Sequence, residues 1–114
     1  MERIVSLMTI KEGCEDEYIR RHQAVWPELQ REMARAGIHE MSIYMHGRQL
    51  FLYMEVKDYA ESGRILSESP ESRRWEEYMG EIMETAAGDD YGPADAYPDG
   101  LPEVFHWKAS SIES

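Results

Sequence analysis

Tyr18 and His22 are the two side chains whose types and spacing are best suited to chemistry in this sequence. They are four residues apart, so a helix would place the phenol and the imidazole side by side on one face. A histidine near neutral pH can both donate and accept a proton, and a tyrosine hydroxyl can donate a hydrogen bond to a substrate oxygen. The pair therefore predicts acid-base chemistry on a small molecule. The alternative is a structural pair in which both rings only pack on the core.

The segment EYIRRHQAVWPEL, residues 17–29, must position this pair. Four of its residues recur at helical spacing: Tyr18, His22, Val25 and Leu29. Proline lacks an amide proton and disfavours helical geometry in the residue before it. We therefore expect one helix from Glu15 to His22 and a second that begins at Pro27. A break after the pair exposes the helix end and favours a pocket wall there.

Strand-like runs flank the helical segments. Three of them are rich in β-branched, aromatic and other apolar residues: 3–10, 38–45 and 50–57. The last two are separated by residues 46–49, which include Gly47, and this is typical of a β-hairpin. Asp58 with Glu61, and Ser69 with Pro70, mark the starts of two further helices.

The C-terminal part of the sequence is less regular. Residues 88–102 are rich in Gly, Pro and Asp, so we expect a long loop there, in which Tyr91 or Tyr97 either covers the site or lies in a solvated excursion. The segment EVFHW, residues 103–107, predicts a short last strand. Residues 109–114 predict a partly ordered tail.

The order β-α-β-β-α-β predicts an α+β, ferredoxin-like fold with helices on one face of an antiparallel sheet. One domain spanning residues 1–114 agrees with the chain length. The other face of the sheet would carry Tyr, Phe and Met side chains that need cover. We therefore expect a homodimer with paired antiparallel sheets, a dimeric α/β barrel.

Composition excludes several classes of function. The formal net charge of −11 disfavours nucleic acid and acidic membrane surfaces, whereas a small neutral molecule is unaffected. Cys14 is the sole cysteine and the apolar run near the start is far shorter than a membrane span, so we expect a cytoplasmic protein. His39, His46 and His106 lack a metal-ligand spacing, and no phosphate-binding glycine loop is present. We expect neither a metal nor a cofactor.

The sequence resembles the L-rhamnose mutarotase family from the first strand to Trp107. Four segments carry the resemblance: EYIRRHQAVWPEL, GIHEMSIYMHGRQLFLYMEV, RRWEEYM and EVFHW. The first is the most specific, because it combines E-Y-x-R-R-H with W-P-E-L at fixed offsets. The resemblance implies a ferredoxin-like dimer with paired sheets. It also implies a cofactor-free enzyme that interconverts the α and β anomers of a 6-deoxyhexose.

The same resemblance implies roles for individual residues. His22 matches the catalytic histidine of the family and Tyr18 matches its sugar-contacting tyrosine. Trp75 matches the first of two consecutive tryptophans that pack on the sugar, but the second position is occupied by Glu76. This departure leaves the identity of the sugar open.

Further residues are weaker candidates. Tyr44 and Tyr53 on the hairpin are candidate substrate contacts, with simple packing as the alternative. Glu55 is a candidate second proton carrier if it points into a half-buried site, which would raise its pKa, and is otherwise solvent-facing. Trp26 either offers sugar-facing surface or packs in the core. For His106 we expect a structural role.

Two other functions share the expected fold. One is a cofactor-free monooxygenase whose aromatic cavity holds a planar substrate. The other is a non-catalytic protein that binds a small ligand. The Tyr18–His22 pair before the Trp-Pro break favours the sugar isomerase.

Overall fold

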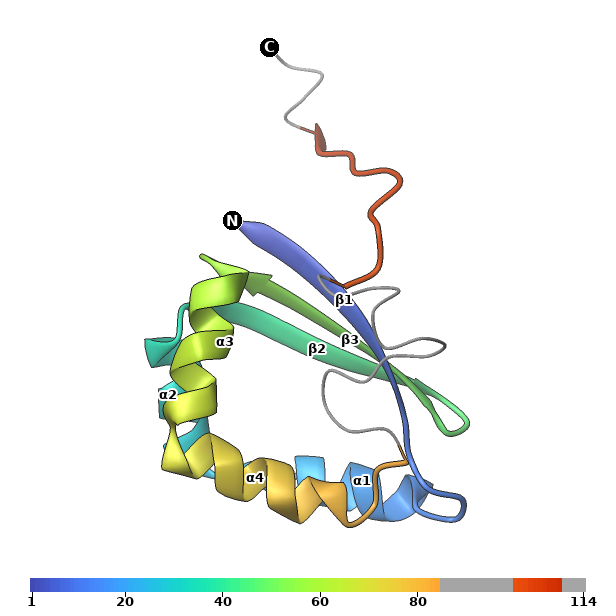
Figure 1. Ribbon diagram of the computed structural model, residues 1–114. Coiled ribbons are helices and arrows are strands. Elements are labelled where there is room, and N and C mark those ends of the chain that lie inside the picture. The colour runs from blue at the N-terminus through green and yellow to red at the C-terminus, as the bar shows by residue number, and fades with distance from the viewer. Residues whose placement is uncertain (85–99, 110–114) are drawn as a thin grey trace.

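The described helices all lie on one face of an antiparallel sheet (Figure 1). The computed structural model describes residues 1–84 and 100–109. Within them the strands are β1 (Glu2–Thr9), β2 (Ile38–His46) and β3 (Gln49–Val56), arranged in the order β1-β3-β2. The three predicted strands and the hairpin are confirmed. The hairpin is tighter than expected, because its turn is reduced to Gly47, at φ 61°, and Arg48.

Strand alternation separates the two faces of the sheet. Met8 pairs with Leu50 and Ile4 pairs with Met54 across β1 and β3, and these side chains share the face that the helices cover. Leu50 and Val56 on this face are fully buried. The helix layer must therefore close over this face, as Figure 1 shows.

The helix layer is built from two broken helical segments. Its elements are α1 (Glu15–His22), α2 (Pro27–Arg35), α3 (Tyr59–Glu68) and α4 (Pro70–Gly80). Trp26 has extended backbone angles and Pro27 begins α2, which confirms the predicted break. Asp58 accepts a hydrogen bond from the amide of Glu61 at 3.1 Å, so the predicted cap of α3 is also confirmed.

The core lies where α1 and α4 face the sheet. Its buried members are Ile10, Tyr18, Leu50, Met79 and Ile82. Trp75 and Met8 pack against this cluster and are themselves only partly buried. The core therefore continues into side chains that have one free surface.

The predicted last strand is wrong. The amide of Leu101 donates a hydrogen bond to the carbonyl of Val5 at 2.7 Å, after which residues 102–108 form no strand. Val104 is 95% exposed and Phe105 is 80% exposed, because this arm leaves the sheet (Figure 1). Most of the expected 88–102 loop, including Tyr91 and Tyr97, and the end of the tail lie outside the described residues.

The helices between residues 1 and 84 are short and carry many charged side chains. None of those described has the length and apolar character needed to cross a lipid bilayer.

Candidate active site

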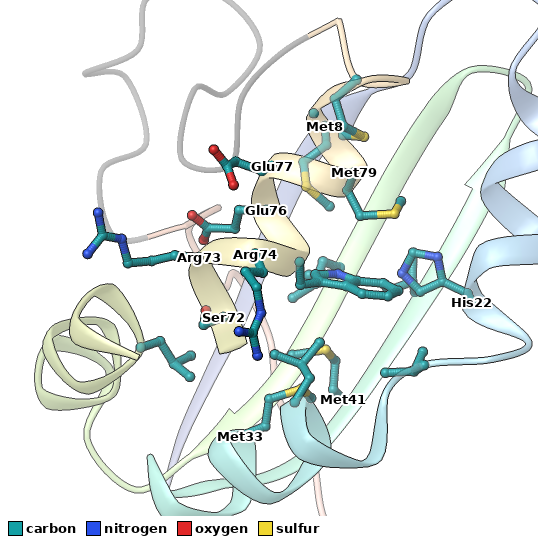
Figure 2. Close-up of a pocket in the computed structure, with 18 of the residues that line it drawn as sticks. Met8, His22, Met33, Met41, Ser72, Arg73, Arg74, Glu76, Glu77 and Met79 are labelled. Atoms are coloured by element: carbon teal, nitrogen blue, oxygen red, sulfur yellow. The ribbon is translucent and has the colours of Figure 1, made fainter. Parts of the chain in front are cut away.

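A cavity of about 880 Å³ lies between the helix layer and the inner face of the sheet. This volume is within the range of small-molecule sites. Most of its wall is apolar, and six methionines contribute to it: Met8, Met33, Met41, Met54, Met79 and Met83. Figure 2 shows several of them around the side of the cavity that carries His22. Such unbranched side chains adapt to the shape of a ligand.

Tyr18 and His22 lie together at the wall of this cavity, as their helical spacing predicts. Their rings stack with centroids 4.3 Å apart. Tyr18 is 5% exposed, so it belongs to the core as well as to the cavity wall. Tyr18 therefore anchors α1 to the core and also supports the imidazole of His22.

The hydrogen bond of His22 selects its tautomer. Nδ1 lies 3.1 Å from the main-chain oxygen of Tyr18. A carbonyl oxygen can only accept, so Nδ1 carries the proton and donates it. In the neutral ring Nε2 is then the unprotonated nitrogen, and within the described residues no hydrogen bond occupies it. This nitrogen is a suitable base.

Burial controls the charge of both side chains. It lowers the pKa of His22 below its usual 6.5, and the hydrogen bond to Tyr18 opposes this effect less strongly. It raises the pKa of Tyr18 to about 12. At neutral pH the site therefore combines a neutral imidazole that can accept a proton with a phenol that keeps its own.

Trp75 supplies the aromatic surface beside this pair. Its ring meets His22 edge to face, with centroids 5.5 Å apart and an interplanar angle of 87°. Trp26 packs on Trp75 at 5.0 Å and on Tyr78 at 5.6 Å, and it does not line the cavity. Trp26 therefore has the packing role that was one of the two alternatives.

Glu76 contributes to the cavity edge rather than to its interior. It is one of the lining residues, yet its side chain is exposed. In Figure 2 the carboxylates of Glu76 and Glu77 project from α4 away from His22. Helical geometry explains this, because consecutive residues point about 100° apart and Trp75 takes the inward direction.

The structure does not bring the two hairpin tyrosines to the cavity. Tyr44 is 67% exposed, and the register places Tyr44 and Tyr53 on the outer face of the sheet, opposite the helices. Tyr53 donates a hydrogen bond to Glu55 at 2.8 Å on that face. The alternation of side chains along a strand excludes both tyrosines from a site on the inner face of their own chain.

Glu55 is not the second proton carrier of this cavity. It lies on the outer face of the sheet, and the hydrogen bond from Tyr53 is the largest cause that lowers its pKa. Of the two alternatives for Glu55, the residue therefore follows the one in which it faces away from the cavity, and the condition for a raised pKa is not met. The sign is reversed because the carboxylate gains a donor and is not enclosed in apolar surroundings.

No group of three metal-ligating side chains occurs within residues 1–84 and 100–109. His39 and His46 are exposed, and His106 lies 3.7 Å from Glu103 on the exposed arm.

Several residues that line the cavity were not predicted from the sequence. Met41 and Ile43 line the cavity from β2, and Met33 lines it from α2. Alternation along residues 38–45 could have indicated the shared face of Met41 and Ile43. The sequence offers no comparable signal for Met33, since an apolar residue on a helix packs in the core more often than it lines a pocket.

Comparisons with known proteins identify one family for this chain. Residues 3–107 match the family model described as L-rhamnose mutarotase. The L-rhamnose mutarotase of Opitutus terrae is 40% identical over 93% of this chain and 98% of its own, and that of Phocaeicola vulgatus is 36% identical over the same shares. The crystal structure of an L-rhamnose mutarotase from Formosa agariphila is 26% identical, with a TM-score of 0.73 over 95% of this chain and 100% of its own.

Proposed function

Because this chain belongs to the L-rhamnose mutarotase family, a family of isomerases, we propose that it interconverts the α and β anomers of L-rhamnose or a related 6-deoxyhexose. The observation that carries the proposal is the state of His22. Its Nδ1 donates a hydrogen bond to the main-chain oxygen of Tyr18, and its ring lines an apolar cavity beside Trp75.

The proposed reaction needs two proton transfers and no redox step. His22 accepts the proton of the C1 hydroxyl at Nε2 as the bond between C1 and the ring oxygen breaks. The ring oxygen takes up a proton from solvent water as it leaves, and an open-chain aldehyde results. Rotation about the C1–C2 bond then presents the other face of the aldehyde. In the reverse of these transfers the ring closes with C1 inverted.

Tyr18 and Trp75 have supporting roles in this proposal. The hydroxyl of Tyr18 keeps its proton at neutral pH and orients the sugar by donating a hydrogen bond to an oxygen. Trp75 and the methionine wall offer apolar contact to the carbon face and the methyl group of a 6-deoxy sugar. A 6-deoxyhexose carries no charged group, which agrees with the mostly apolar wall of the cavity.

The energetic requirement on this site is modest. A positioned acid or base contributes about 10²–10⁴-fold to a rate, which corresponds to roughly 3–5 kcal/mol of barrier. Mutarotation already proceeds in water, so one well-placed imidazole is sufficient. No cofactor is required for the chemistry.

We further propose that residues 1–114 act as one domain that forms a homodimer through the outer face of the sheet. Phe51 lies on that face, paired with Leu7 on β1 and with Tyr44 on β2. No described helix covers it (Figure 1). The exposed arm adds further apolar surface near the same face, at Val104, Phe105 and Trp107. Burial of this surface against a second copy is the simplest way to remove it from water.

Saturation-transfer NMR tests the proposed activity. One anomeric proton of the sugar is saturated, and the loss of signal at the other anomer measures their exchange. We expect the protein to accelerate exchange for L-rhamnose, and comparison with L-fucose defines its selectivity. Unchanged exchange for every deoxyhexose tried would overturn the proposal.

A further inference from the structure

Arg21 is almost enclosed although it carries a charge. Only 9% of its side chain is exposed. Nε donates to Glu17 at 2.6 Å, Nη2 donates to Glu81 at 3.0 Å, and Nη1 donates to the main-chain oxygen of Tyr78. The guanidinium also lies over the ring of Tyr78, with Cζ 3.9 Å from its centroid. A planar fork of donors can make all these contacts at once, whereas an ammonium cannot.

These contacts connect α1 with the C-terminal end of α4. The last turn of α4 has no basic residue of its own. The main-chain oxygen of Tyr78 is in that turn, where it also accepts a hydrogen bond from the amide of Glu81 at 3.4 Å and where a positive charge is favourable. Arg21 supplies this charge from the neighbouring helix.

A row of aromatic contacts leads from Arg21 back to the active site. The ring of Tyr78, beneath the guanidinium, is 5.7 Å from that of Trp75. Trp75 in turn meets His22 edge to face at 5.5 Å. His22 directly follows Arg21 in α1, so the row starts and ends on consecutive residues of one helix. Consecutive residues point in different directions, and this places His22 at the cavity and Arg21 at the end of α4.

We propose that Arg21 is a positioning residue for the active site: it holds Tyr78, and through Tyr78 it fixes Trp75 against the imidazole of His22. This inference rests on the proposed function. A catalytic group that loses its orientation loses rate steeply, because a misplacement of about 1 Å can cost on the order of 10²-fold. Arg21 itself does not line the cavity.

The ion pair between Arg21 and Glu17, called the clamp below, stays charged throughout the pH range in which His22 titrates. Hydrogen bonds from Arg20 and then Arg21 lower the pKa of Glu17 to about 2. The hydrogen bond to Glu17 is the largest cause that raises the pKa of Arg21 above its usual range. Acidification toward the pKa of His22 therefore protonates the imidazole and leaves the clamp intact.

The variants Arg21→Lys and Arg21→Met test this role, with Arg64→Met as the matched control. Arg64 on α3 also contacts two carboxylates, those of Glu61 and Glu68, but lies away from the cavity wall. The anomer exchange of L-rhamnose gives kcat and KM. Proton NMR gives the resonances of the His22 ring, assigned by their loss in His22→Gln. These resonances respond to the ring current of Trp75 and so report on the contact itself.

We expect both Arg21 variants to lower kcat by about 10- to 100-fold and to change KM by less than about threefold. The His22 ring protons should shift in both variants and remain in place in Arg64→Met. Lysine at position 21 should not restore kcat, because it keeps the positive charge but not the planar fork of donors or the stacking on the ring of Tyr78. If Arg21→Met does not fold, the kcat and the His22 resonances of Arg21→Lys alone test the positioning role.

Wild-type kcat and unshifted His22 protons in a folded Arg21→Lys would overturn the positioning role. Failure of the proposed function gives a different result, because wild-type protein would then not accelerate anomer exchange. The NMR shift still reports on the clamp in that case.

Discussion

At His22, burial and one hydrogen bond act in opposite directions on the imidazole proton. Desolvation of the charged ring lowers the pKa, and the main-chain oxygen of Tyr18 raises it by a smaller amount. The ring is therefore neutral at physiological pH, and its protonated Nδ1 leaves Nε2 as the base. The direction of this balance determines how activity depends on pH.

We predict that kcat/KM rises with pH through a single ionisation whose midpoint lies below 6.5, the usual pKa of histidine. The neutral base is the active form, so activity is lost as the pH falls through the lowered pKa. A pH–rate profile, with the His22 pKa measured by NMR in parallel, checks this. Activity that increases on acidification would show that the imidazolium is the working form.

Glu76 follows Trp75 on α4, at the position where the sequence resemblance implies a second tryptophan. The variant Glu76→Trp adds aromatic surface at the cavity edge, and we expect it to lower KM for L-rhamnose by about two- to tenfold with kcat changed by less than about threefold. Kinetics of Glu76→Trp and Glu76→Gln separate the gain of a ring from the loss of a charge. An equal effect of both variants would mean that the carboxylate, and not the missing ring, matters.

The pairing of Tyr18 with His22 could be predicted from the sequence because a helix fixes which residues are neighbours. The exclusion of Tyr44 and Tyr53 could not. Strand alternation shows that these two share a face, but the side on which the helices pack is decided by tertiary structure. The contact of Arg21 with Tyr78 on α4 could not be predicted from the sequence either, since it joins residues 57 positions apart.

At the scale of elements, the start of α4 positions the aromatic wall. Ser69 is 1% exposed, and its hydroxyl accepts a hydrogen bond from the amide of Ser72 at 3.3 Å, at the start of the helix that carries Trp75. Asp58 caps α3 in the same way, away from the cavity. Serine and aspartate before a helix are strong local signals, which is why both starts were predictable.

Removal of either cap should cost stability, but only one should affect the site. We expect Ser69→Ala and Asp58→Ala each to lower the free energy of unfolding by about 1 kcal/mol. Urea denaturation measures this loss. Under conditions in which both variants remain folded, Ser69→Ala should also reduce kcat, because fraying of α4 loosens Trp75. Equal activities of the two variants would argue against α4 as the support of the site.

The missing fourth strand has a physical cause that local sequence does not contain. EVFHW has the residue types of a strand, yet a strand forms only where an edge offers successive hydrogen bonds and a face to cover. After Leu101 the arm diverges from the edge of β1, so successive hydrogen bonds do not form and Val104, Phe105 and Trp107 stay exposed (Figure 1).

At the scale of the whole molecule, the bare outer face leads to a prediction about assembly. We expect light scattering to give twice the chain mass of 13.3 kDa. Phe51→Glu should shift the protein toward the monomer, because a charge at the centre of an apolar interface is left without a partner. The control Ala60→Glu adds the same charge at an exposed position of α3 and should leave the mass unchanged. A wild-type monomer would exclude the paired-sheet dimer.

The central claim is that His22 carries the proton transfer, and the anomer exchange of L-rhamnose in His22→Ala protein tests it most directly. Wild-type protein should accelerate exchange, and the folded variant should lose about 10²–10⁴-fold of that acceleration while ligand-detected NMR still shows sugar binding. A folded His22→Ala protein that exchanges the anomers as fast as wild type would contradict the account.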